Sequence, residues 1–258
     1  MSIAYWSIET RKIIEWIEMQ RILGLDKIIV YNNSLSTNAQ AVFSHYANTD
    51  FLELRQSHNF MSDYGETTFH LHSSPVINDC MYRNMYRYKH IAILDFDEFM
   101  VPHANFTLLE LIRHMENIEE VYHPTRSYVF QNAYFFFDHK PDTTQPEHLR
   151  TMRYRTRQTE NVIGYSAKSI INPISCFAMH NHYCWGVNKL YENGNHMSFV
   201  PPSIGLLHHY KMCHLDTFNV KPGECQNLTR TGIQDDTMLK YKDKLLQAVD
   251  KRIEMIGL

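Results

Sequence analysis

The chain has 258 residues and a formal net charge of -3, with 44% hydrophobic and 21% charged residues. This composition is typical of an ordered globular protein and argues against a disordered chain or a basic nucleic-acid-binding protein. The length suits one α/β domain, and the sequence has neither an apolar run of transmembrane length nor a signal-like N-terminus. We therefore expect a chain that is soluble as it stands, without an anchor, a membrane span or a nucleic-acid partner.

Cysteines and glycosylation motifs give weaker indications of the compartment. Five cysteines are too few and too scattered for a disulfide scaffold, and their odd number leaves at least one thiol free or intermolecular. None of them has the C-x-x-C spacing of a zinc site. Three N-x-S/T motifs lean slightly toward a lumenal location, and they begin at Asn32, Asn105 and Asn227.

The N-terminal half predicts strands and helices in alternation, as in parallel βαβ units. Gly24 is placed to end the first helix, Ser36 or Thr37 to cap the second, and Pro75 to lie in the first turn of the third. The predicted elements are strands over 2–6, 27–31 and 51–54 and helices over 10–23, 36–46 and 73–88.

The stretch from His90 to Phe99 is the most informative part of the sequence. It begins as a buried apolar strand and then places three carboxylates, Asp95, Asp97 and Glu98, within four positions. On a strand, the side chains of Asp95 and Asp97 point the same way. Such a cluster is costly unless it is paired, and a divalent cation such as Mg²⁺ or Mn²⁺ is its commonest partner. At the carboxyl edge of an α/β sheet, the pattern predicts a metal that holds a phosphorylated substrate.

Two alternatives stay open for this cluster. Asp-x-Asp is a short motif, and acids after a strand often cap the next helix. Asp95 is also a candidate nucleophile of a metal-dependent phosphohydrolase, although that chemistry usually places its motif on the first strand, and here it follows the fourth. The sequence has no Gly-x-Gly-x-x-Gly, Gly-Lys-Ser/Thr or Gly-x-Ser-x-Gly motif, which argues against dinucleotide, P-loop and serine-hydrolase sites.

The C-terminal half predicts a mixed or antiparallel extension of the sheet. No linker divides the chain, so we predict one domain over 1–258, with a nucleotide-binding half to about 120 and an acceptor-side half beyond about 121. Arg153, Arg155 and Arg157 fall on one strand face as a candidate phosphate grip, although the solvated face of an edge strand is the commoner explanation. The predicted elements are helices over 107–118 and 237–256, strands over 127–137, 168–171 and 205–210, and a strand-like alternating basic segment over 149–157.

Several blocks, in the right order, resemble glycosyltransferase family 92. Together they cover nearly the whole chain, and five blocks in sequence are more specific than any one of them. The blocks are Glu15-Trp16-Ile17-Glu18 with Val30-Tyr31-Asn32-Asn33, Asn78-Asp79-Cys80-Met81-Tyr82-Arg83, Leu94-Asp95-Phe96-Asp97-Glu98-Phe99, Lys168-Ser169-Ile170-Ile171-Asn172-Pro173 with His180 and His182, and His208-His209-Tyr210-Lys211.

This resemblance implies a GT-A-like fold, an α/β Rossmann-type mixed sheet flanked by helices, and an inverting hexosyltransferase. The enzyme would use Mn²⁺ (or Mg²⁺) to move a sugar from a nucleotide-sugar donor, UDP-galactose above all, to a glycan acceptor. Asp97 would hold the metal, with His209 or His208 as a late ligand. Asp95 would face the ribose or the metal, and Glu98 would support the site. The donor-binding residues carried over by position are Tyr31, Asn32, Asn78, Arg83, Asp95 and Lys168.

The resemblance leaves the catalytic base and the N-terminus open. Members usually carry a membrane anchor and act in the Golgi, whereas Met1 lies almost on the first strand. If that strand is missing, part of the nucleotide pocket is open and activity is in doubt. A catalytically silent, lectin-like or scaffold copy is therefore an alternative. An inverting enzyme needs a carboxylate to deprotonate the acceptor hydroxyl, and the candidates are Asp216, Glu224, Asp235 and Asp236, of which the last two are better explained as helix caps.

Overall fold

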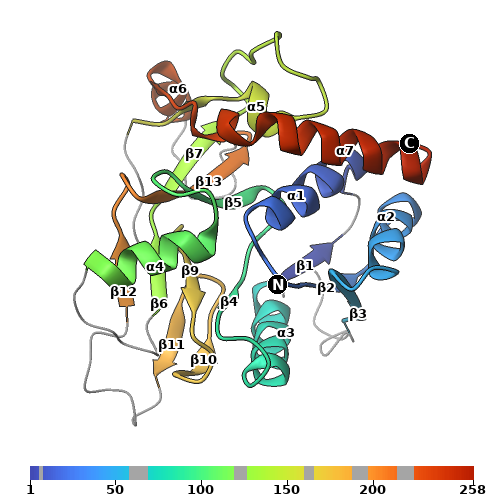
Figure 1. Ribbon diagram of the computed structural model, residues 1–258, viewed down its shortest axis with the longest axis vertical. Helices are drawn as coiled ribbons and strands as arrows, with labels where there is room; N and C mark the ends of the chain where they lie inside the picture. The colour runs from blue at the N-terminus through green and yellow to red at the C-terminus, as the bar shows by residue number, and fades with distance from the viewer. Residues whose placement is uncertain (6–7, 58–68, 119–126, 160–165, 188–196, 214–223) are drawn as a thin grey trace.

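The computed structural model describes residues 1–5, 8–57, 69–118, 127–159, 166–187, 197–213 and 224–258. Strands occupy the middle of the molecule, and helices pack around them (Figure 1). The arrangement confirms the predicted fold class, a mixed α/β sheet flanked by helices.

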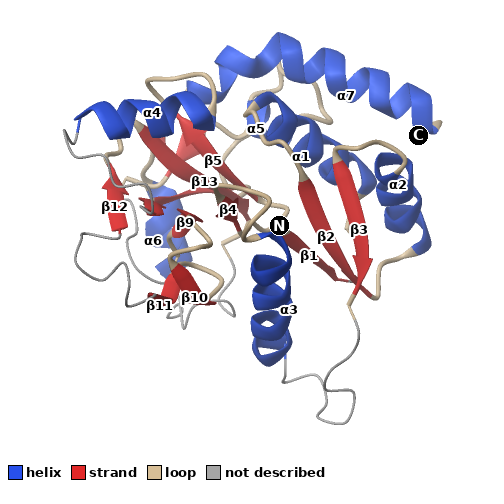
Figure 2. Ribbon diagram, turned by 60° about the horizontal axis from the view of Figure 1, so that its bottom comes forward, coloured by secondary structure: helices blue, strands red, loops and turns tan. Residues whose placement is uncertain are grey.

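Three parallel strands form the N-terminal sheet. The strand β2 pairs with β1 along one edge and with β3 along the other, so the first strand, which the resemblance put in doubt, is present. Ile28 and Val30 of β2 belong to the main core with residues of α1 and α2, and Ile29 and Tyr31 pack with Val76 and Cys80 of α3. Figure 2 shows α1 and α2 on one side of this sheet and α3 on the other. Burial on both faces is expected of a parallel strand. The elements are β1 (Ser2–Tyr5), α1 (Thr10–Ile22), β2 (Ile28–Asn33), α2 (Thr37–Ala47), β3 (Leu52–Gln56) and α3 (Phe69–Asn84).

The local sequence correctly marks the end of α1 and the start of α2. Gly24 comes just after α1 with a φ of +88°, a left-handed conformation that glycine adopts without steric cost. The Ser36 side chain caps α2 by accepting a hydrogen bond from the backbone N–H of Ala39. The boundaries predicted for α3 are wrong, since Pro75 lies inside the helix and the helix ends at Asn84. Burial of the α3 face against β2 and β4 outweighs the local proline signal.

The strand β4 (Ile91–Ala92) joins the N-terminal sheet to a second sheet. The Met1 amine donates a hydrogen bond to the carbonyl of Ala92 at 2.7 Å, and the N–H of Leu94 donates to the carbonyl of Met1 at 3.0 Å. The strands β1 and β4 therefore lie side by side. Beyond β4 the strand order is β4-β9-β6-β12, formed by β9 (Lys168–Ile171), β6 (Ser127–Phe130) and β12 (Met197–Val200).

A third sheet places β13 (Gly205–Lys211) between β5 (Glu98–Pro102), to which it is antiparallel, and β7 (Asn132–Phe136), to which it is parallel. The single strand predicted over 127–137 is wrong, because Gln131 separates β6 from β7 and the two belong to different sheets. Every residue of both strands is buried, so no polar turn signal marks the break.

The remaining elements cover the ends of these sheets, and α7 lies along α1 (Figure 1). The strand-like segment predicted over 149–157 is wrong, because α5 occupies its first half. Its arginines form ion pairs instead of one basic face: Arg155 pairs with Asp142 and Asp236, and Arg157 with Asp235. The elements are α4 (Leu108–Ile118), α5 (Arg150–Arg153), β8 (Thr156–Arg157), β10 (Cys176–Met179), β11 (Cys184–Val187), α6 (Glu224–Arg230), β14 (Ile233–Gln234), the 3₁₀ helix η4 (Thr237–Tyr241) and α7 (Lys242–Ile256).

Two disulfides close short segments of the C-terminal half, Cys176–Cys184 and Cys213–Cys225. Cys80, buried on α3, is the remaining thiol and is free, as the odd cysteine count predicts. Within the described ranges, no helix has the length and apolar character needed to cross a membrane.

Glu15 connects α1 to the C-terminal half. Its buried carboxylate accepts hydrogen bonds from the backbone N–H groups of Arg150 and Thr151 and from the Thr151 hydroxyl, at 2.7 to 3.1 Å. It thereby satisfies N–H groups that the short helix α5 leaves unpaired. Burial raises the pKa of Glu15 to about 7, although these hydrogen bonds oppose the shift.

We predict that Glu15 makes the fold less stable as the pH rises from 4.5 to about 7. Over that window the unfolded chain releases the Glu15 proton while the folded chain retains it, and above it both states are ionised. The loss is at most about 3 kcal/mol. Urea unfolding as a function of pH, compared between the wild type and Glu15→Gln, measures it as a fall that the variant lacks. Equal pH dependence in both proteins would contradict the assignment.

Candidate functional site

The residues Asp95 to Glu98, here called the acidic turn, connect β4 to β5. The N–H of Glu98 donates to the carbonyl of Asp95 at 3.1 Å, and the Glu98 carboxylate accepts from the N–H of Asp95 at 2.9 Å. These reciprocal hydrogen bonds bend the chain, so Asp95 and Asp97 do not lie on a continuous strand as the sequence pattern predicts. The Asp95 side chain is 53% exposed, that of Asp97 25%, and that of Glu98 only 3%.

Phe96 anchors the acidic turn to the hydrophobic core. Its ring packs edge-on against Trp16 of α1, with centroids 4.7 Å apart, and against Phe43 of α2 at 5.5 Å. The Trp16 indole N–H also donates to the carbonyl of Glu98 at 3.0 Å. Because Phe96 faces inward, the carboxylates on either side of it are held at the edge of the core.

Lys168 of β9 is a fully buried cation whose ammonium group contacts the acidic turn. Its Nζ lies 3.2 Å from Asp95 Oδ2, 3.0 Å from Glu98 Oε2 and 3.0 Å from Asn181 Oδ1. Burial alone would lower the pKa of Lys168, but the charges of Asp95 and Glu98 outweigh burial and raise it. An ammonium has three protons, and all three have acceptors here. Lys168, predicted to bind donor phosphate, is thus occupied in fixing the carboxylates.

The two consecutive histidines of β13 face opposite ways, because side chains alternate along a strand. His209 Nε2 lies 3.5 Å from Asp97 Oδ2, and its Nδ1 lies 3.6 Å from Glu98 Oε1. Burial would raise the pKa of Asp97, but the hydrogen bond and charge of His209 outweigh it and hold the pKa well below its usual range. His208 points away from the acidic turn and lies with His103 and Asp235.

Asp97 and His209 fit two neighbouring ligands of a divalent cation. Their 3.5 Å separation is close to the roughly 3 Å between adjacent ligands of an ion with bonds of about 2.1 Å. The three carboxylates of the turn also outnumber the single charge of Lys168, which leaves excess negative charge. Asp95 is turned toward Lys168, so the remaining positions on an ion would fall to substrate oxygens and water. One imidazole among oxygen ligands suits Mn²⁺ better than Mg²⁺.

Lys211 and Tyr134 are site residues to which the sequence analysis assigns no role, although Lys211 ends the block that begins at His208. Lys211 lies two positions after His209 and therefore on the same face of β13. Its Nζ lies 5.8 Å from the centre of the Tyr134 ring, which also contacts His209 at 5.1 Å. Burial lowers the pKa of Lys211, and the charges of Asp97, Glu98 and Asp95 oppose that shift. Lys211 thus brings a cation to the face of β13 from which His209 meets Asp97.

The other donor-binding candidates have partners of their own. Tyr31 donates a hydrogen bond to Asp79 at 2.6 Å, and Arg83 donates to the second oxygen of Asp79 at 2.8 Å. The Asn32 side chain accepts from the N–H of Leu35 at 3.0 Å and so shapes the turn after β2. None of these contacts reaches the acidic turn.

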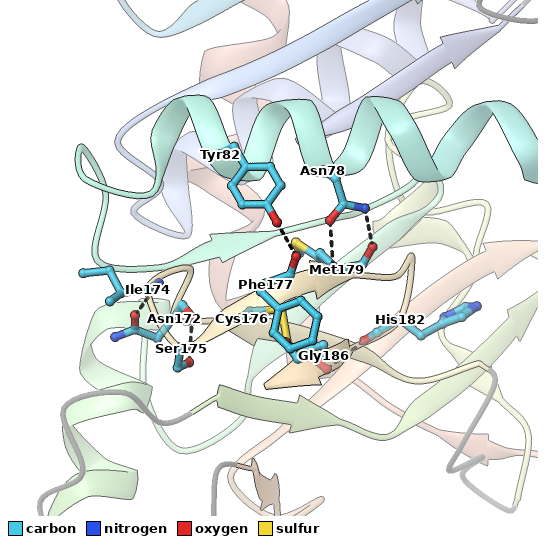
Figure 3. Close-up of a disulfide and its surroundings, with 12 residues drawn as sticks. Asn78, Tyr82, Asn172, Ile174, Ser175, Cys176, Phe177, Met179, His182 and Gly186 are labelled. Carbon is cyan, nitrogen blue, oxygen red and sulfur yellow. Dashed lines mark hydrogen bonds between the residues drawn. A yellow bond between two sulfur atoms is a disulfide. The ribbon is translucent and has the colours of Figure 1, made fainter. Parts of the chain in front are cut away.

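Asn78 fixes the β10–β11 hairpin to α3. It exchanges two hydrogen bonds, each of 2.9 Å, with the backbone of Met179 (Figure 3). The tip of the hairpin in turn brings Asn181 to Lys168. On the outside of the hairpin, the Trp185 ring is 64% exposed and stacks on His180, with centroids 4.2 Å apart. The disulfide-closed hairpin therefore links α3 to the acidic turn.

The described base candidates, Asp235 and Asp236, make their ion pairs away from the acidic turn. Asp235 is bound by Arg157 at 2.9 Å, and Asp236 pairs with Arg155. Outside the described residues lie Asp216 and the side chain of Glu224. A cavity of about 200 Å³ is lined by Met1, parts of α1 and α4 and the start of β2, and it does not include the acidic turn.

We predict that Lys168→Met lowers the free energy of unfolding by about 3 to 5 kcal/mol, because it leaves Glu98 buried without a counter-charge. The double variant Lys168→Met/Glu98→Gln should recover part of this loss. Urea denaturation measures both. The matched control is Lys89→Met, whose exposed side chain pairs with Glu116 at 3.8 Å and should change stability by less than about 1 kcal/mol. Equal effects at Lys168 and Lys89 would contradict the role of Lys168.

Comparison with known proteins gives one family. The family model for glycosyltransferase family 92 matches residues 1–249. A crystal structure of S. aureus TarS 1–349 in complex with UDP is similar to the chain at 10% identity, with 98% of this chain and 71% of that chain covered and a TM-score of 0.45. Two further S. aureus TarS structures are 11% identical, cover 98% of this chain and 43% and 70% of theirs, and have TM-scores of 0.40 and 0.39. The curated proteins contain no match.

Proposed function

The chain belongs to glycosyltransferase family 92, and we propose that it is a metal-dependent hexosyltransferase. It moves a hexose, galactose by the family resemblance, from a UDP-sugar to a glycan acceptor with inversion. The observation that carries this proposal is the pairing of Asp97 with His209 on an acidic turn that Lys168 and Phe96 hold in place. Such a preorganised carboxylate–imidazole pair suits a divalent cation better than it suits any neutral ligand.

Mn²⁺ (or Mg²⁺) would be held by Asp97 and His209. When bound, the ion would stabilise the negative charge that develops on the leaving diphosphate. Glu98 faces the other nitrogen of His209 and supports the orientation of the ring. The positive charge of Lys168 offsets the repulsion among the carboxylates of the acidic turn. We assign phosphate binding to Lys211 instead, since it lies on the same face as His209.

An inverting transfer also needs a carboxylate that removes the proton of the acceptor hydroxyl. Asp235 forms an ion pair with Arg157, and Asp236 forms one with Arg155. These ion pairs fasten the C-terminal segment. We therefore retain Asp216 and Glu224 as the base candidates.

A Golgi location, which the family resemblance implies, agrees with the two disulfides. Disulfides persist in secretory compartments and are rare in the cytosol. The sequons at Asn32, Asn105 and Asn227 lean the same way.

We predict that Asp97→Asn and His209→Ala each lower Mn²⁺-dependent release of UDP from a UDP-hexose by at least about a hundredfold. The assay is a screen of nucleotide sugars with Mn²⁺, together with thermal stabilisation by UDP and Mn²⁺. The control is Asp236→Asn, which should keep activity because Asp236 pairs with Arg155 away from the turn.

Other outcomes of the same screen identify the competing functions. A folded wild type that shows no response to UDP and Mn²⁺ would indicate a silent copy of the fold. A phospho-aspartyl or beryllofluoride adduct at Asp95 would indicate a phosphohydrolase.

We also predict that Lys211→Ala raises KM for the UDP-sugar by about tenfold, the effect of losing one charged contact to phosphate. Lys211→Arg should retain most of the affinity, because it keeps the charge on the same face. Initial-rate kinetics over a range of donor concentrations separate KM from kcat. An unchanged KM in Lys211→Ala would remove Lys211 from the donor site.

A further inference from the structure

A second cluster of metal-ligating side chains lies on the face of β13 opposite the acidic turn. It consists of His208 on β13, His103 just after β5, and Asp235 just before η4, and we call it the His–His–Asp cluster. One ligand atom from each residue lies within 4.8 Å of the other two. His208 is fully buried and Asp235 is 9% exposed, so the cluster is not a chance gathering of surface charges.

The two imidazoles meet at the spacing of zinc ligands. His103 Nε2 and His208 Nε2 lie 3.4 Å apart. Two ligands of a tetrahedral Zn²⁺ with bonds of about 2.0 to 2.1 Å are separated by about 3.3 Å. The Asp235 carboxylate, within 4.8 Å of both, needs to approach by up to roughly 1.5 Å to complete three protein ligands.

Outer contacts orient two ligands of the cluster, His208 and Asp235. His208 Nδ1 faces the Tyr210 hydroxyl at 3.4 Å, and the hydroxyl in turn donates to the carbonyl of Thr151 at 3.5 Å. This arrangement favours a proton on Nδ1 and leaves the lone pair of Nε2 toward His103. Asp235 accepts hydrogen bonds from Arg157 at 2.9 Å and from the N–H of Thr237 at 3.0 Å. Partners of this kind on the far side of each ligand are characteristic of metal sites.

We propose that the His–His–Asp cluster binds one Zn²⁺ ion, separate from the donor site. The choice of ion follows from the ligands, because imidazole with one carboxylate suits zinc better than Mg²⁺ or Ca²⁺. Arg157 and Lys240 place positive charge near His208, and this charge repels any cation in the cluster. An ion that binds here therefore needs a high affinity for imidazole.

The ion would fasten the C-terminal segment to the third sheet. His103 and His208 belong to the adjacent strands β5 and β13, whereas Asp235 opens the segment that continues through η4 into α7. A metal shared by the three residues would cross-link positions 103, 208 and 235. Its role is structural, because the acidic turn lies on the other face of β13.

The test is metal binding by the full chain after removal of bound metal with a chelator. When Zn²⁺ is added back to the metal-free wild type, we expect about one equivalent to remain bound after gel filtration. Co²⁺ added in its place should give the visible absorption of a tetrahedral site. Zn²⁺ should also raise Tm. His103→Ala should abolish the Co²⁺ band, and Asp235→Asn should weaken Zn²⁺ binding at least about tenfold. Circular dichroism of each metal-free variant checks that it folds.

Asp97→Asn is the matched control, since it alters the donor site and should leave the Co²⁺ band unchanged. Loss of the band in Asp97→Asn and its retention in His103→Ala would place the ion at the acidic turn and overturn the proposal. A wild type that retains no Zn²⁺ would also overturn it, and would leave His103 and His208 as a neutral hydrogen-bonded pair. Neither result depends on transferase activity, so the proposed function stands or falls separately.

Discussion

The arrangement of the site depends on one buried ion cluster, in which Lys168 neutralises carboxylates that would otherwise repel one another. A lysine without solvent exposure is rare, because removal of an ammonium from water costs several kcal/mol. Here Asp95, Glu98 and Asn181 supply its three acceptors. The cluster ties the acidic turn to β9 and to the β10–β11 hairpin, which lie more than 70 residues further along the chain, so all three share one electrostatic centre.

Both faces of the strand β13 carry candidate functional side chains. His209 and Lys211 project toward the acidic turn, and His208 projects toward His103 and Asp235. The register with β5 sets this division, because His209 pairs with Glu98 and His208 with Phe99. A slip of one residue would exchange the two histidines and dismantle both clusters together.

Much of this organisation could be predicted from local sequence. The run from Ile91 to Glu98 identifies a buried segment that ends in carboxylates, and Gly24 and Ser36 mark the ends of helices correctly. Long-range pairing could not be predicted in the same way. Nothing near Lys168 indicates that Asp95, 73 residues away, accepts a hydrogen bond from its ammonium group, and nothing at Gln131 shows that two buried strands belong to different sheets. The choice between His208 and His209 likewise required the strand register.

The hairpin beside Lys168 carries an optical probe. The indole of Trp185 is 64% exposed and stacks on the imidazole of His180, one residue before Asn181. Fluorescence of an indole in such a stack is sensitive to the charge and distance of its neighbour. Emission from Trp185 therefore reports displacement of the hairpin tip without an attached dye, over the emission of Trp6 and of Trp16, which is buried in the core.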